Sequence, residues 1–66
     1  MSFVVYVVGP RISATFYRDT ASEAVGKAKE MVRQGAVSIT DPRGEIWIPD
    51  QFDEMLQTWP EQSPHP

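Results

Sequence analysis

The sequence predicts an α+β fold: a four-stranded sheet of two β-hairpins (ββαββ), with one helix packed on one face and a short C-terminal helix. The sequence contains two pairs of short segments that are apolar or alternate between apolar and polar residues. Within each pair, a proline-containing turn separates the two segments. Between the pairs lies a stretch whose apolar residues recur at helical spacing. The chain has 66 residues, which allows a single domain. We assign this domain to residues 1–59 and predict a disordered, proline-rich tail at 60–66.

The first hairpin begins at the N-terminus. Residues 3–8 are β-branched or aromatic, with apolar side chains on both faces, which is typical of a strand inside a sheet. A Gly-Pro pair at 9–10 breaks the run. From Ile12 to Tyr17 apolar and polar residues alternate, so this second strand has one buried face. We therefore place the first strand inside the sheet, next to the second.

The central helix begins at a capping box formed by Thr20 and Glu23. Its apolar positions, spaced by three and four, are 21, 24, 25, 28, 31 and 32. Glu23 and Lys27 have the order of a favourable pair, worth about 0.2–0.5 kcal/mol. Gly35 is expected to end the helix in a left-handed conformation. Gly26 lies mid-helix on the polar face, where it costs about 1 kcal/mol against alanine and has no evident structural reason.

The second hairpin follows the helix. Val37 and Ile39 alternate with hydroxyl residues, the Asp-Pro-Arg-Gly sequence at 41–44 suits a type I turn, and residues 45–48 form the fourth strand. Asp50 is expected to cap the C-terminal helix. The apolar residues of that helix are Phe52, Met55, Leu56 and Trp59. Because about ten residues make a marginal helix alone, this helix must dock on the domain to persist.

The composition excludes several classes of function. The chain has no cysteine, hence no disulfide framework, thiolate nucleophile or cysteine-based zinc site. Its only histidine, His65, lies in the predicted tail, and no glycine-rich phosphate-binding motif is present. Asp50, Asp53 and Glu54 form an acidic cluster, which the start of a helix explains better than a metal does. The sequence therefore predicts no enzyme activity, no metal and no cofactor.

The predicted location is the cytoplasm. The apolar run at residues 3–8 is far shorter than the roughly 20 residues that cross a bilayer. No basic segment precedes this run and no cleavage site follows it, so it lacks the features of a secretion signal. We therefore expect no association with a membrane.

The second face of the predicted sheet is the most informative feature for function. Its expected apolar residues are Val4, Tyr6, Val8, Tyr17 and, if Ile46 and Ile48 face the helix, Trp47; hydroxyl residues of the neighbouring strands accompany them. An apolar, aromatic patch rimmed by hydroxyl groups is typical of a protein interface. The alternative is that the C-terminal helix folds back and covers this face. An outer edge strand offers a second route to pairing with a partner.

The sequence thus favours a non-catalytic protein–protein interaction module, either a homodimer or bound to another protein. Aromatic side chains dominate interface energetics, so the candidate contact residues are Tyr6, Tyr17 and Trp47.

The alternative function is nucleic-acid binding, with exposed aromatic rings for base stacking. Its candidate cations are the hairpin-tip residues Arg11 and Arg43 and the helix residues Lys27 and Arg33. Nine acidic residues against six basic ones disfavour this function. A third hypothesis, a small acidic protein filling a cationic groove, rests only on a net charge of −3, which is ordinary for a protein in solution.

The chain also resembles a known kind of protein. The residues that carry the resemblance are those at 39–47 and 49–53, together with Thr20, Glu23, Ala24, Ala28 and Gly35. They resemble small uncharacterised bacterial ββαββ proteins, a domain of unknown function, in which a Thr-x-x-Glu-Ala-capped helix precedes a hairpin with an Asp-x-x-Gly turn. The resemblance spans about residues 3–56 and implies the same fold. It implies no activity, cofactor or catalytic residue.

Overall fold

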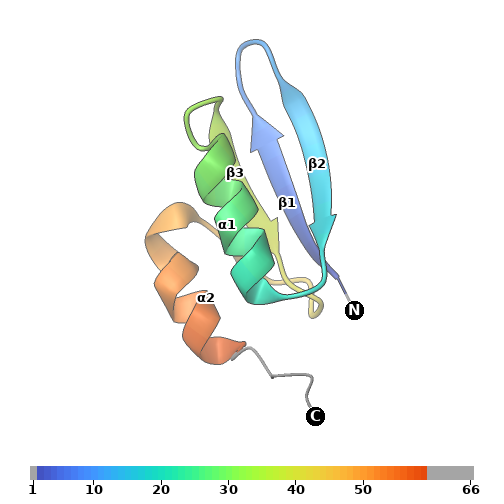
Figure 1. The fold of residues 1–66 in the computed structure, drawn as a ribbon, viewed down its shortest axis with the longest axis vertical. Coiled ribbons are helices and arrows are strands. Elements are labelled where there is room, and N and C mark those ends of the chain that lie inside the picture. The colour runs from blue at the N-terminus through green and yellow to red at the C-terminus, as the bar shows by residue number, and fades with distance from the viewer. Residues whose placement is uncertain (1, 60–66) are drawn as a thin grey trace.

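The predicted α+β class and element order are confirmed by a computed structural model, which describes residues 2–59 (Figure 1). The elements are β1 (Phe3–Val8), β2 (Ser13–Arg18), α1 (Ala21–Met31), β3 (Ala36–Thr40), β4 (Ile46–Trp47), η1 (Pro49–Gln51, one 3₁₀ turn) and α2 (Phe52–Thr58). The predicted tail at 60–66 lies outside the described residues.

The sheet has the strand order β2-β1-β3-β4, and every neighbouring pair is antiparallel. The prediction that β1 lies inside the sheet beside β2 is confirmed. Val5 of β1 lies opposite Phe16 of β2 on one side and Ile39 of β3 on the other. Because β2 and β3 both run against β1, they are parallel to each other, and α1 connects them across β1.

Both helices pack on the same face of the sheet, which we call the inner face (Figure 1). The buried core comprises Phe3, Val5 and Val7 of β1, Val37 and Ile39 of β3, Trp47 of β4, Ala21, Ala24, Val25 and Ala28 of α1, and Phe52 and Met55 of α2. The Trp59 ring meets the Phe3 ring edge-on at a centroid distance of 5.3 Å. The expectation that α2 docks is therefore confirmed, and the alternative that it covers the opposite face is wrong.

Thr20 caps α1 in a modified form of the predicted box. Its hydroxyl oxygen accepts the Glu23 backbone N–H at 3.1 Å, as expected, while the hydroxyl group donates to the Glu23 carboxylate at 3.2 Å. The expected pair between Glu23 and Lys27 is wrong, because Lys27 instead bonds Glu30 at 3.4 Å. The Lys27 ammonium also lies 4.4 Å from the centroid of the Phe16 ring, where it covers an aromatic side chain of β2.

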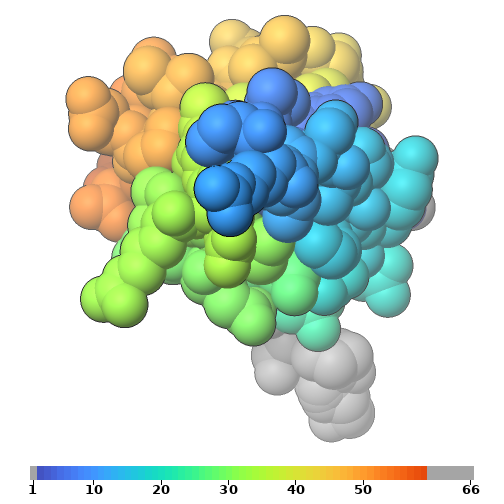
Figure 2. Space-filling model, turned by 90° about the horizontal axis from the view of Figure 1, so that it is seen from above, coloured from blue at the N-terminus to red at the C-terminus, as the bar shows by residue number. Residues whose placement is uncertain are grey.

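Gly35 does not form the predicted left-handed cap. Among the described residues only Gly44 has a positive φ, of 89°. A Cβ atom on Gly35 would lie 2.5 Å from the Val8 carbonyl oxygen, and one on Gly9 would clash with the Gln34 carbonyl oxygen. Glycine is needed here because the connection between α1 and β3 crosses the β1–β2 turn at close range (Figure 2).

Candidate functional site

The candidate site is the face of the sheet opposite the helices, which we call the outer face. Directly opposed residues of an antiparallel pair share a face, so the register defines which side chains lie together. The outer face consists of three rows: Tyr17, Val4, Thr40 and Ile46; then Thr15, Tyr6 and Ser38; then Ser13, Val8 and Ala36.

None of these ten residues is charged, although the chain carries six basic and nine acidic residues. Four large side chains of the outer face are strongly exposed: Tyr17 and Ile46 at 64%, Val8 at 61% and Tyr6 at 41%. A sheet face in contact with water ordinarily carries polar and charged side chains. The outer face therefore lacks the charges that a solvated sheet face ordinarily carries.

The prediction that Trp47 lies on this face is wrong. Trp47 pairs with Ile39, which points toward the helices, and its own side chain is only 8% exposed. The outward residue of β4 is its neighbour Ile46. The cause is the indole N–H, which needs an acceptor when buried and finds it in the Asp41 carboxylate at 3.0 Å.

Asp41 is a buried carboxylate held by four N–H groups. One oxygen accepts the backbone N–H groups of Arg43 at 2.8 Å and Glu45 at 2.9 Å. The other accepts the indole N–H groups of Trp47 at 3.0 Å and Trp59 at 3.1 Å. Burial raises the pKa of Asp41, while the hydrogen bonds, led by that of Trp47, lower it; the net result is a pKa below its ordinary value.

This cluster is structural rather than catalytic. Four donors occupy the acceptor positions of the Asp41 carboxylate, which leaves none for a substrate proton or a metal ion. The Arg43 guanidinium lies 4.9 Å from the Trp59 ring centroid and closes the cluster on one side. The expected turn is confirmed, because the Gly44 N–H donates to the Asp41 carbonyl oxygen at 2.9 Å. The Trp59 bond had no signal in the local sequence, since Trp59 lies 18 residues away.

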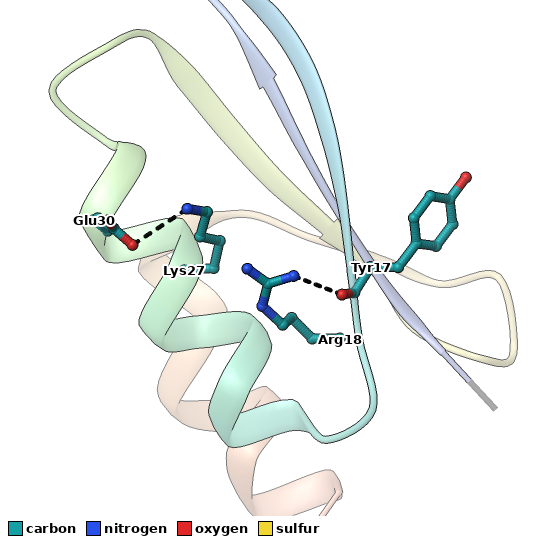
Figure 3. A network of polar contacts seen from close by, with 4 residues as sticks. All are labelled: Tyr17, Arg18, Lys27 and Glu30. Atoms are coloured by element: carbon teal, nitrogen blue, oxygen red, sulfur yellow. Dashed lines mark hydrogen bonds and ion pairs between the residues drawn. The ribbon is translucent and has the colours of Figure 1, made fainter.

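The four cations of the nucleic-acid hypothesis do not gather around the outer-face tyrosines. Arg11 lies in the β1–β2 turn and Arg43 in the β3–β4 turn, at opposite ends of the sheet (Figure 1). Lys27 lies on α1, on the helix side, whereas the Tyr17 ring points away from that helix (Figure 3). Arg33 follows α1 in the connection to β3.

The acidic residues near α2 are arranged differently from the expectation. Asp50 lies within the 3₁₀ turn and does not cap α2, whose N-cap position is Gln51. Asp53 and Glu54 occupy the first turn of the helix, as predicted. Within residues 2–59, no group of three or more acidic or histidine side chains is arranged to hold a metal ion.

Two further findings complete the description of the site. In the part of the chain that the structure describes, no helix has the length and apolar character needed to cross a bilayer. Comparison with known proteins gave no match to a family model, to a curated protein or to a solved structure.

Proposed function

We propose that this chain is a non-catalytic protein–protein interaction module that self-associates through the outer face of its sheet. The observation that supports the proposal is the absence of charge from ten side chains, four of them large and at least 41% exposed. Tyrosine is enriched at interfaces because its ring buries a large apolar area while its hydroxyl group stays hydrogen-bonded.

A second copy of the chain fits this surface. An uncharged face meets its own copy without like-charge repulsion, and a two-fold axis makes one patch complementary to itself. Among residues 2–59, the charged side chains lie on the helices, in the turns and connections, and at the end of β2.

The size of the outer face sets the strength of this association. Ten outward residues, each covering about 6.6 Å along its strand and about 4.8 Å across it, give roughly 300 Å² per copy, or about 600 Å² for the pair. Stable complexes bury about 1,200–2,000 Å². We therefore expect a weak, reversible dimer with a Kd in the micromolar range or above, not an obligate one.

The test is sedimentation equilibrium of the full chain from micromolar to millimolar concentration. We expect the mass to rise from 7.5 kDa toward twice that value. The double variant Tyr6→Lys/Tyr17→Lys should lose the association that the outer face provides, and its net charge nearer zero rules out general repulsion as the cause. Val32→Lys is the matched control, since Val32 is 49% exposed but lies outside the outer face. A wild-type mass of 7.5 kDa throughout would refute self-association.

A further inference from the structure

The two edges of the sheet differ in how they are protected. β4 is two residues long, preceded by Glu45 and followed by Pro49 in a 3₁₀ turn. β2 is six residues long, pairs with β1 at every position without a bulge, and has no charged residue from Ser13 to Tyr17. Native sheets guard exposed edges with short strands, charges, proline or bulges, and β2 has none of these along those five residues. Figure 1 shows β2 at one edge of the sheet, with α2 on the side of α1 away from β2.

The hydrogen-bond pattern of the hairpin shows which backbone groups of β2 face outward. The Gly9 N–H donates to the Ile12 carbonyl oxygen at 2.8 Å, so these two residues form a hydrogen-bonded pair. Bonded and non-bonded pairs alternate along an antiparallel ladder. The N–H and C=O groups of Ser13, Thr15 and Tyr17 therefore point away from β1. Consistent with this, the Tyr17 carbonyl oxygen accepts the Arg18 guanidinium at 2.7 Å (Figure 3).

We infer that β2 pairs with β2 of a second copy, antiparallel and centred on Thr15, to form a continuous eight-stranded sheet. Outward groups must meet outward groups, so Thr15 lies opposite Thr15 of the second copy and Ser13 lies opposite its Tyr17. Threonine pairs across strands are favourable. On the inner face the small Ala14 lies opposite the large Phe16 of the second copy. When the strands pair, the hydrogen bond between the Arg18 guanidinium and the Tyr17 carbonyl oxygen breaks, and water solvates the guanidinium instead. The free-energy cost is small because that hydrogen bond is exposed.

Charge complementarity favours this register. Continued past the strand ends, this register brings the turn residue Arg11 of each copy near Asp19 of the other, so that one ion pair can close each end of the joined strands. Both residues are exposed. A shift of two residues places Asp19 opposite Ser13, or Arg11 opposite Tyr17, and the ion pairs are lost. The register that joins the outward backbone groups is thus also the one that pairs the charges.

The helices leave room for this arrangement. The two β1 strands would lie three strand spacings apart, or about 14 Å. An α-helix with its side chains is about 10–12 Å wide, so two copies of α1 fit side by side on the inner face. This interface uses the edge of the sheet and is independent of the outer face, so either can exist without the other.

Charge exchange in the full chain tests the pairing directly. Arg11→Glu and Asp19→Arg should each weaken association roughly tenfold at low ionic strength, and the double variant should restore it. The two residues lie beyond opposite ends of β2, whose six residues span roughly 20 Å, so the double variant cannot compensate within one chain. Asp19→Arg also lowers the net negative charge, and would strengthen association if only general repulsion mattered. Arg33→Glu, which changes net charge as Arg11→Glu does, is the matched control.

Amide hydrogen exchange separates the edge from the outer face. We expect the amides of Ser13, Thr15 and Tyr17 to exchange more slowly as concentration rises, in the wild type and equally in Tyr6→Lys. Thr15→Pro removes an N–H that β1 does not use, so this variant should fold and lose the edge interface. The inference is overturned if these amides stay unprotected at millimolar concentration, or if the double charge exchange fails to restore association. If Thr15→Pro still self-associates and Tyr6→Lys/Tyr17→Lys does not, the dimer forms through the outer face and the edge pairing is refuted.

Discussion

Asp41→Asn tests whether one buried carboxylate joins the β3–β4 turn, β4 and the end of α2. The asparagine keeps a single acceptor oxygen, and its amide N–H₂ group would face N–H donors. Each hydrogen bond to a charged acceptor contributes about 1.5–3 kcal/mol. Loss of the two bonds at one oxygen therefore costs about 3–6 kcal/mol, with the backbone bonds of the turn retained.

That loss is large for so small a domain. At about 0.05–0.15 kcal/mol per residue, 66 residues give a free energy of unfolding of roughly 3–10 kcal/mol. If the wild-type free energy of unfolding lies in the lower half of that range, Asp41→Asn should be largely unfolded or close to its midpoint without denaturant. Urea titration followed by tryptophan fluorescence is the assay, because the only two tryptophans of the chain both bond Asp41.

A milder variant keeps the reasoning testable if Asp41→Asn does not fold. Trp59→Phe removes one indole bond but retains a ring against Phe3, so we expect a loss of about 1.5–3 kcal/mol. Where Asp41→Asn does fold, a double-mutant cycle adds a second test: its effect and that of Trp59→Phe should couple by about 1 kcal/mol or more. Additive effects, or an Asp41→Asn variant within 1 kcal/mol of wild type, would refute the assigned role of the carboxylate.

Three further predictions concern pH and two glycines. The pKa of Asp41 is lowered in the folded state, so the folded protein binds a proton at this carboxylate less readily than the unfolded chain does. The ionised carboxylate therefore stabilises the fold fully above the unfolded pKa of about 3.9. This stabilisation is lost as pH falls through the folded pKa. Acid titration of the free energy of unfolding should show this slope, and a pH-independent value between neutrality and pH 3 would contradict it. Gly26→Ala should raise stability by about 1 kcal/mol, since no atom lies within 4 Å of the added Cβ, and thermal unfolding should show a higher Tm. Gly35→Ala should lower the Tm, because its Cβ meets the Val8 backbone; a gain in both glycine variants would show that the close crossing is not rigid.

The local signals in the sequence were sufficient for the elements and their order. Alternation identified β2, helical spacing identified α1, and the Asp-Pro-Arg-Gly turn fixed the second hairpin. These features depend on residues close together in the chain, where period and turn chemistry act directly. The uncharged outer face of β1 and β2 followed from the same alternation, and Tyr6 and Tyr17 lie where it placed them.

The errors arose where distant residues decide the outcome. β4 has only two residues, so alternation could not show on which face of the sheet Trp47 lies. Strand pairing with Ile39 and the hydrogen bond to Asp41 place Trp47 on the inner face. The apolar stripe of α2 predicted that this helix docks on the domain, but it did not predict on which face of the sheet. Trp59 determines that face, because its ring contacts Phe3 and its indole N–H donates to Asp41. At Gly35 the residue type fitted a helix cap, while the actual constraint comes from Val8 on another strand.

The chemistry of the outer face also argues for the kind of association that this module makes. An obligate interface resembles a divided core and is dominated by large aliphatic and aromatic side chains. Here hydroxyl groups of Ser13, Thr15, Ser38 and Thr40 surround the exposed tyrosines, and a hydroxyl group is well solvated in a free monomer. The same groups can hydrogen-bond to a partner, whereas a charged side chain would have to lose its hydration shell. A face without charge but rich in hydroxyl groups is thus compatible with both water and a partner, which is what reversible association of a small domain requires.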